Sequence, residues 1–203
     1  MAPNRPGGRT AIVRAAVLDA TADLLVESGL EGVDLAEVAR RACVGKSTVY
    51  RRWGSVSALV TDLLADMAET SLPRPDTGSL AGDLRSIAGL IQRTLADPRQ
   101  GRLFAAIIAA ATCSPDTATA LAGFYRSRLS ELAGTVTDGI ARGEAPPDTD
   151  PADVLRYLSA PLYHRLLTGN GPPEVDDAVR STRAALAAVA AGVFTAERAP
   201  VLP

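Results

Sequence analysis

Apolar side chains recur at intervals of three and four residues along most of the chain, a spacing typical of amphipathic helices. Glycine, proline and capping residues separate these apolar stripes from one another. The pattern predicts nine helices, at about residues 10–28, 35–42, 46–53, 56–70, 80–96, 102–112, 115–142, 151–167 and 174–196. Pro161 lies inside the eighth of these and is expected to kink or locally break it.

Composition supports helices and excludes a sheet protein. Only 4% of the 203 residues are aromatic, whereas 47% are hydrophobic, with alanine and leucine dominant. Strands are normally built from β-branched and aromatic residues, and alanine and leucine favour helices. The fold class is therefore predicted to be all-α, with one good core or two small adjoining ones.

Charge is distributed unevenly along the chain. Residues 1–60 contain eight basic and six acidic side chains, although the whole chain has a net charge of −2. Between Val38 and Thr61 every charged residue is basic: Arg40, Arg41, Lys46, Arg51 and Arg52. A local basic patch can attract phosphate even when the whole protein is acidic, so DNA binding is not excluded.

The same stretch has the pattern of a helix-turn-helix. Asp34 can cap a helix that starts at Leu35, and Glu37 is spaced to complete a capping box. The segment 43–45, Cys-Val-Gly, then ends this helix with a tight turn. A second helix from Lys46 to about Trp53 would be about 12 Å long, which is short enough to lie in a major groove.

This region resembles the DNA-binding domain of the TetR/AcrR family of transcriptional regulators. The matching positions between Gly29 and Leu59 are Gly29, Leu35, Val38, Ala39, Ala42, Val44, Lys46, Thr48, Tyr50, Trp53, Ala58 and Leu59. Three positions depart from the family pattern. Cys43 replaces the usual turn glycine, Gly45 a capping serine, and Val56 a lysine that commonly meets a phosphate.

The resemblance implies an N-terminal helix-turn-helix DNA-binding domain over residues 1–54 and a connecting helix over 55–71. Residues 72–203 would then form a C-terminal helical bundle for ligand binding and dimerisation. It also implies a homodimer that pairs through the last two helices, as in related regulators. The alanine-rich surface of the final helix agrees with that role, because small residues let helices approach closely.

The second helix of the motif supplies the predicted contacts to double-stranded operator DNA: Lys46, Ser47, Thr48, Tyr50, Arg51 and Arg52. The first three lie in the first turn, which faces the groove in helix-turn-helix complexes. Arg51 and Arg52 are either phosphate anchors or solvated charges. Val49 either touches a thymine methyl or packs inward, and Trp53 is expected to be a packing wedge.

A small-molecule effector is expected to bind in the apolar interior of the C-terminal domain. The residues proposed to line that pocket are Phe104, Ile107, Ile108, Phe124, Tyr125 and Tyr157. Each of these residues is more often part of a plain core, so the prediction concerns the neighbourhood rather than any single contact. The predicted function is a repressor that a small apolar ligand releases from a near-palindromic operator. A DNA-binding regulator without an effector is the alternative.

Other classes of function find little support. An enzyme would need Cys113 as nucleophile and His164 as base, but no nucleophile elbow or glycine-rich nucleotide loop is present. Cys43, Cys113 and His164 have no metal-site spacing, so neither a metal, a disulfide nor a cofactor is expected. No apolar run is long enough for a membrane span and no secretory signal is evident, which predicts a cytoplasmic protein.

Overall fold

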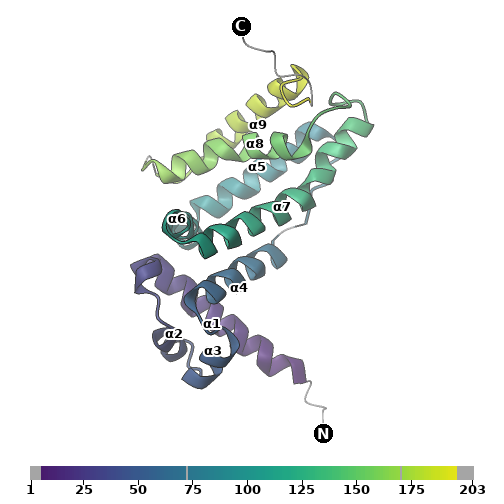
Figure 1. Cartoon of the computed structure of the whole chain (residues 1–203). Coiled ribbons are helices and arrows are strands. Elements are labelled where there is room, and N and C mark those ends of the chain that lie inside the picture. The colour runs from purple at the N-terminus through teal and green to yellow at the C-terminus, as the bar shows by residue number, and fades with distance from the viewer. Residues whose placement is uncertain (1–5, 72, 170, 196–203) are drawn as a thin grey trace. The chain divides into compact units, whose positions relative to one another are not determined.

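The computed structural model describes residues 6–71, 73–169 and 171–195. Within these residues the chain forms nine α-helices and one short 3-10 helix, so the predicted all-α fold is confirmed (Figure 1). The only β-type pairing in the described part of the chain is an isolated bridge between Thr149 and Thr195. The helices are α1 Pro6–Ser28, α2 Leu35–Arg41, α3 Lys46–Arg52, α4 Val56–Glu69, α5 Leu80–Ala96, α6 Pro98–Cys113, α7 Pro115–Ala141, α8 Pro151–Leu167 and α9 Val175–Ala190.

The chain divides into two compact units. The first comprises Met1–Ser71 and Arg102–Phe124, and the second comprises Leu72–Gly101 and Tyr125–Pro203. Most of α6 and the first part of α7 therefore group with the N-terminal helices, which the sequence pattern does not indicate. The division into domains at 1–54, 55–71 and 72–203 stays a prediction.

In the first unit, α1 is the helix against which the helix-turn-helix motif is built. It packs on α2 and α4, and α2 in turn packs on α3. The contacts bury apolar side chains almost completely, including Val17 and Leu25 on α1, Val38 on α2 and Leu59 on α4. Burying a leucine or valine side chain of this kind stabilises the fold by about 1.5–3 kcal/mol. The motif helices are thus held at a fixed angle by an apolar core.

In the second unit, α5, α8 and α9 pack against one another. Leu84 of α5 and Leu158 of α8 are fully buried in this packing. The inner face of α9 carries small residues, and Ser181 donates a hydrogen bond to the carbonyl of Leu158. The small side chains let α9 lie close to its neighbours.

The structure corrects three predicted helix ends. α1 starts at Pro6 rather than near residue 10. α6 starts at Pro98 rather than near residue 102, because the Asp97 carboxylate accepts hydrogen bonds from the amides of Arg99 (3.0 Å) and Gln100 (2.8 Å). Proline suits the first position of a helix, because a backbone N–H there would have no acceptor within the helix. The residue expected to stop one helix therefore also begins the next.

α9 ends at Ala190, six residues before its predicted end. Gly192 adopts φ 71°, and the amides of Gly192 and Val193 bond back to the carbonyls of Val189 and Ala188, both at 3.0 Å. These two hydrogen bonds form a Schellman motif, which closes a helix C-terminus. At Pro161, by contrast, α8 continues without a break from Pro151 to Leu167.

Candidate nucleic-acid interface

The N-terminus of α2 is capped by Asp34, as predicted. Its carboxylate accepts hydrogen bonds from the amides of Ala36 (3.0 Å) and Glu37 (3.1 Å). The capping box is not formed, because the Glu37 carboxylate is bound instead by Arg40 (2.6 Å) and Arg41 (2.9 Å). Hydrogen bonds from these two guanidinium groups lower the pKa of Glu37 to about 2.

The arginines of α2 are therefore largely neutralised within the protein. Arg41 also pairs with Glu27 on α1 at 2.7 Å. On α3 the situation differs, since Lys46, Arg51 and Arg52 form no ion pair with any residue that the structure describes. The positive charge available to a phosphate is thus concentrated on α3 rather than spread over both helices.

The turn between α2 and α3 is a Schellman motif with a cysteine at its left-handed position. Cys43 is exposed and adopts φ 53°, a conformation that normally requires glycine. Its amide bonds to the carbonyl of Arg40 (3.2 Å), and the amide of Val44 bonds to the carbonyl of Ala39 (2.9 Å). The turn keeps its geometry without the glycine that the family usually has there, and the residue carries backbone strain.

α3 has one buried face and one exposed face. Val49 is fully buried, so it packs inward and does not reach a base. Tyr50 is 49% exposed, and Lys46, Ser47, Arg51 and Arg52 are also exposed, while Thr48 is half-buried. All six residues predicted to contact DNA lie on this one helix. Their contacts with DNA stay a prediction.

Trp53 ends the buried face of α3 and is 9% exposed. Its indole nitrogen donates a hydrogen bond of 2.8 Å to the carboxylate of Asp62 on α4. The Arg52 guanidinium lies 4.8 Å from the centre of the indole ring and donates to the Thr10 carbonyl at 3.4 Å. Sequence reasoning identified the packing role of Trp53 but missed Asp62, because no motif marks that aspartate.

The six residues proposed to line an effector pocket are divided between the two units. Phe104 and Phe124 pack together in the first unit, with ring centres 5.9 Å apart. Ile107 is fully buried and Ile108 half-buried in that same unit.

The remaining two belong to the second unit. The Tyr125 ring meets the edge of Tyr163 at 5.8 Å. Tyr157 is 63% exposed on α8 and contacts Phe194 at 5.2 Å. The structure thus brings together only part of the set, and the pocket stays a prediction.

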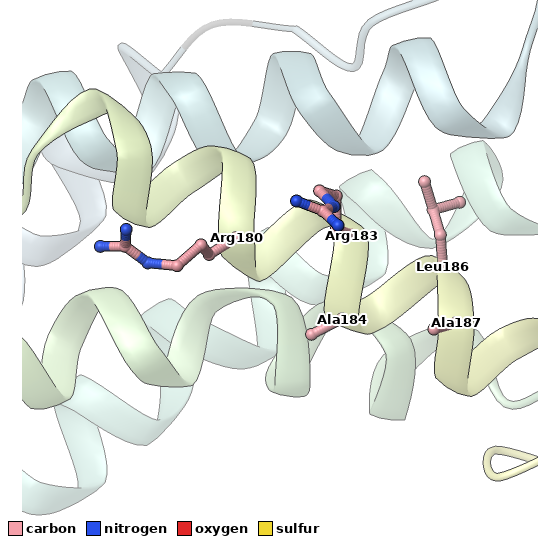
Figure 2. Close-up of a pocket in the computed structure, with 5 residues that line it drawn as sticks. All are labelled: Arg180, Arg183, Ala184, Leu186 and Ala187. Atoms are coloured by element: carbon pink, nitrogen blue, oxygen red, sulfur yellow. The ribbon is translucent and has the colours of Figure 1, made fainter.

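The second unit carries an open groove of about 520 Å³ on the outer surface of α9 (Figure 2). Its lining consists of Arg180, Arg183, Ala184, Leu186 and Ala187. The two exposed alanines add little side-chain bulk to this shallow surface, and the two arginines border it on the same helix. No residue predicted to bind an effector lines it.

Other kinds of site find no support in the described residues. They contain no group of three metal-ligating side chains, and none of their helices is both long and apolar enough to cross a membrane. Cys43 and Cys113 are exposed free thiols.

A short exposed helix with unpaired cations, held by a turn on a capped partner helix, is the architecture of a helix-turn-helix DNA-binding protein. Comparison with known proteins narrows this class. Residues 17–63 match the family model for bacterial regulatory proteins of the tetR family, and residues 74–197 match the tetracyclin repressor-like C-terminal domain. The chain belongs to the TetR family, and it is a DNA-binding transcriptional regulator.

Two relatives match over most of their length. YdeS of Bacillus subtilis (strain 168), an uncharacterized HTH-type transcriptional regulator, is 32% identical over 164 residues, which cover 80% of this chain and 81% of the relative. The HTH-type transcriptional regulator AqdR of Rhodococcus erythropolis is 33% identical over 163 residues, which cover 80% and 78%.

Solved structures of the family share the fold. The TetR family transcription regulator SCO0332 has a TM-score of 0.68 and 28% identity, covering 87% of this chain and 98% of that chain. GusR of Salmonella enterica has a TM-score of 0.70 at 20% identity, over 90% of this chain and 95% of its own.

Proposed function

We propose that this regulator is a homodimeric repressor that releases a near-palindromic operator when a small apolar ligand binds its C-terminal helices. The observation that carries the DNA-binding part is the exposed face of α3, where Lys46, Tyr50, Arg51 and Arg52 have no carboxylate partner among the residues that the structure describes, and Val49 anchors the helix from behind. Members of the TetR family bind DNA and function as dimers.

The proposed contacts divide into two kinds. The side chains in the first turn, Lys46, Ser47 and Thr48, read base edges, because helix-turn-helix proteins point this end of the recognition helix into the major groove. Tyr50, Arg51 and Arg52 bind phosphates, which set the register of the protein on the duplex. Two copies of α3 then enter successive major grooves about 34 Å apart.

The proposed dimer forms through the outer surfaces of α8 and α9. Apolar side chains are exposed on both helices, among them Tyr157 on α8 and Val175 and Val179 on α9. Ala184 and Ala187 line the shallow groove on α9, where a second helix can approach closely. Ligand binding would lower the affinity for DNA by favouring a dimer in which the two α3 helices have the wrong separation.

The DNA-binding proposal is tested by the salt dependence of the affinity for duplex DNA that flanks the protein's own gene. Fluorescence anisotropy between about 50 mM and about 200 mM salt should show a steep loss of affinity, because cations on α3 displace counterions from phosphates. Replacing Arg51 with alanine should reduce the slope of log K against log salt by about 0.9, the value for one phosphate contact.

Arg85→Ala is the matched control for this experiment. Arg85 is exposed on α5 and forms no ion pair with any residue in the described ranges, so its removal changes the net charge equally without touching α3. The slope of Arg85→Ala should equal that of the wild type. Equal slopes for all three proteins would refute the assignment of Arg51, and the absence of binding to any duplex would refute the DNA-binding proposal.

The effector part of the proposal needs its own measurement. Small apolar compounds are added to the preformed protein–DNA complex, and the decrease in anisotropy is followed for each compound. A compound that releases the DNA should also raise the unfolding temperature of the protein, because it binds the folded state. If no compound releases the DNA, the alternative of a regulator without an effector is favoured.

A further inference from the structure

Asp62 on α4 joins three helices of the first unit through its carboxylate. Arg14 of α1 donates to it from Nε at 3.0 Å and from Nη2 at 2.8 Å. Trp53, which follows α3, donates from its indole nitrogen at 2.8 Å. Asp66, one turn further along α4, also pairs with Arg14, at 2.5 Å, but the indole nitrogen of Trp53 donates to Asp62 and not to Asp66.

This carboxylate is partly shielded from water and remains ionised. The side chains of Arg14 and Asp62 are 23% and 27% exposed. Burial raises the pKa of Asp62, but hydrogen bonds from Arg14 and Trp53 outweigh it and leave that pKa lowered. The indole therefore donates to a charged acceptor, which makes a stronger hydrogen bond than a neutral one does.

The other face of the same tryptophan carries a residue predicted to contact DNA. The Arg52 guanidinium lies over the indole ring at 4.8 Å, where the ring quadrupole attracts a cation. A hydrogen bond to the carbonyl of Thr10 holds its far end. Arg52 is thus restrained before any DNA is present, and a restrained side chain loses less conformational entropy when it binds a phosphate.

We propose that Asp62 and Trp53 are positioning residues for Arg52: the carboxylate fixes the indole, and the indole holds the guanidinium at the C-terminal end of α3, where it is proposed to bind a phosphate. The proposal rests on the proposed contact between α3 and DNA and adds a part of α4 to the determinants of that contact. A tryptophan is required for it, since a phenylalanine offers an aromatic face to the guanidinium but has no N–H to donate.

The first test is Trp53→Phe, which keeps an aromatic ring but removes the indole donor together with the smaller ring of the indole. Losing one charge-assisted hydrogen bond should weaken DNA binding by about threefold to tenfold at constant salt. In an Arg52→Ala background the same substitution should change the affinity by less than about twofold, because Trp53 acts through Arg52. A merely structural role for Trp53 would give the same loss in both backgrounds.

The second test compares Asp62→Ala with Asp66→Ala. Each variant removes one carboxylate of α4 that pairs with Arg14, but only Asp62 bonds to Trp53. Asp62→Ala should weaken DNA binding by about threefold to tenfold, and Asp66→Ala by less than about twofold. Trp53 is the only tryptophan of the chain, so its fluorescence should change in Asp62→Ala and stay constant in Asp66→Ala.

These outcomes separate the two proposals. If the wild type binds no duplex DNA, both fail. If the wild type binds and Trp53→Phe binds equally well, the positioning role is overturned and the proposed function stands. Thermal unfolding of each variant shows whether it is folded at the temperature of the binding measurement, and the comparison is made below the lowest unfolding temperature.

Discussion

At the scale of single residues, the turn at Cys43 shows how a local conformation can be maintained against the preference of its side chain. The left-handed conformation at φ 53° brings the β-carbon close to the following carbonyl oxygen, which costs about 1–2 kcal/mol. The hydrogen bonds of the Schellman motif and the buried contacts of α2 and α3 compensate for this cost. The turn is therefore a place where stability can be increased without changing the exposed face of α3.

Replacing Cys43 with glycine should raise the free energy of unfolding by about 0.5–1 kcal/mol. Removing the β-carbon relieves the strain, and the greater freedom of glycine in the unfolded chain offsets part of the gain. Urea unfolding followed by circular dichroism at equal protein concentrations measures the change. Cys43→Ala is the control, since it removes the thiol but keeps the β-carbon. An equal gain in Cys43→Ala would assign the effect to the thiol and contradict the strain argument.

Residues differ in how far the sequence determines their roles. The helical period allows Val49 to face either the DNA or the core, because it lies near the edge of the apolar stripe. In the structure α3 packs on α2 and Val49 is buried. Glu37 was expected to complete a capping box with Asp34. Its carboxylate instead forms ion pairs with two arginines within one turn of the same helix. Asp62 could not be found from the sequence, because its partners lie on α1 and after α3.

At the scale of helices, glycine has opposite effects in different places. Gly192 closes α9 with φ 71°, which an L-residue with a β-carbon rarely adopts. Gly89 lies inside α5 in ordinary helical conformation, where glycine is unfavourable because it is flexible in the unfolded chain. A β-carbon added at Gly89 would meet only the guanidinium end of Arg93, at 3.3 Å, and that side chain can move aside.

The same substitution should therefore change stability in opposite directions at the two positions. Gly192→Ala should lower the free energy of unfolding by about 1 kcal/mol, because the left-handed conformation becomes strained. Gly89→Ala should raise it by about 0.5–1 kcal/mol. Chemical unfolding of both variants beside the wild type measures the difference. A loss of stability in both would show that the interior of α5 tolerates no added carbon at that position.

Helix existence follows from the sequence more securely than helix ends. The 3.6-residue period marks each of the nine helices, because burial of one face requires it. The ends at Pro98 and Ala190 were wrong for physical reasons. Asp97 and Pro98 have the chemistry of a helix start as well as of a helix stop, and the alanine run continues past Ala190 although Gly192 closes the helix. The positions of residues at the proposed effector site depend on how distant helices pack, which no local pattern encodes.

At the scale of the whole molecule, the residues proposed to bind DNA lie far in sequence from those proposed to pair the subunits. The free energies of the two processes are nevertheless coupled. In the proposed dimer, one α3 helix contacts a half-site, and a second copy tethered to the first binds its own half-site at a high effective concentration. The outer surface of α9 carries Ala184 and Ala187 in its shallow groove, next to Arg180 and Arg183. A change that separates the subunits should therefore weaken DNA binding although it lies far from α3 in the sequence.

Ala184→Arg should abolish the dimer. The long cationic side chain prevents close approach of a second helix, and in the proposed symmetric dimer both subunits gain a further positive charge beside Arg180 and Arg183. Light scattering after size-exclusion chromatography should show a monomer. The affinity for the full operator should fall by about 100-fold, because the second half-site no longer adds to binding.

Ala122→Arg, on an exposed position of α7, adds the same charge and should leave both the mass and the affinity unchanged. If Ala184→Arg remains a dimer with normal affinity, the subunits pair through another surface, and the effector mechanism that depends on this pairing loses its basis.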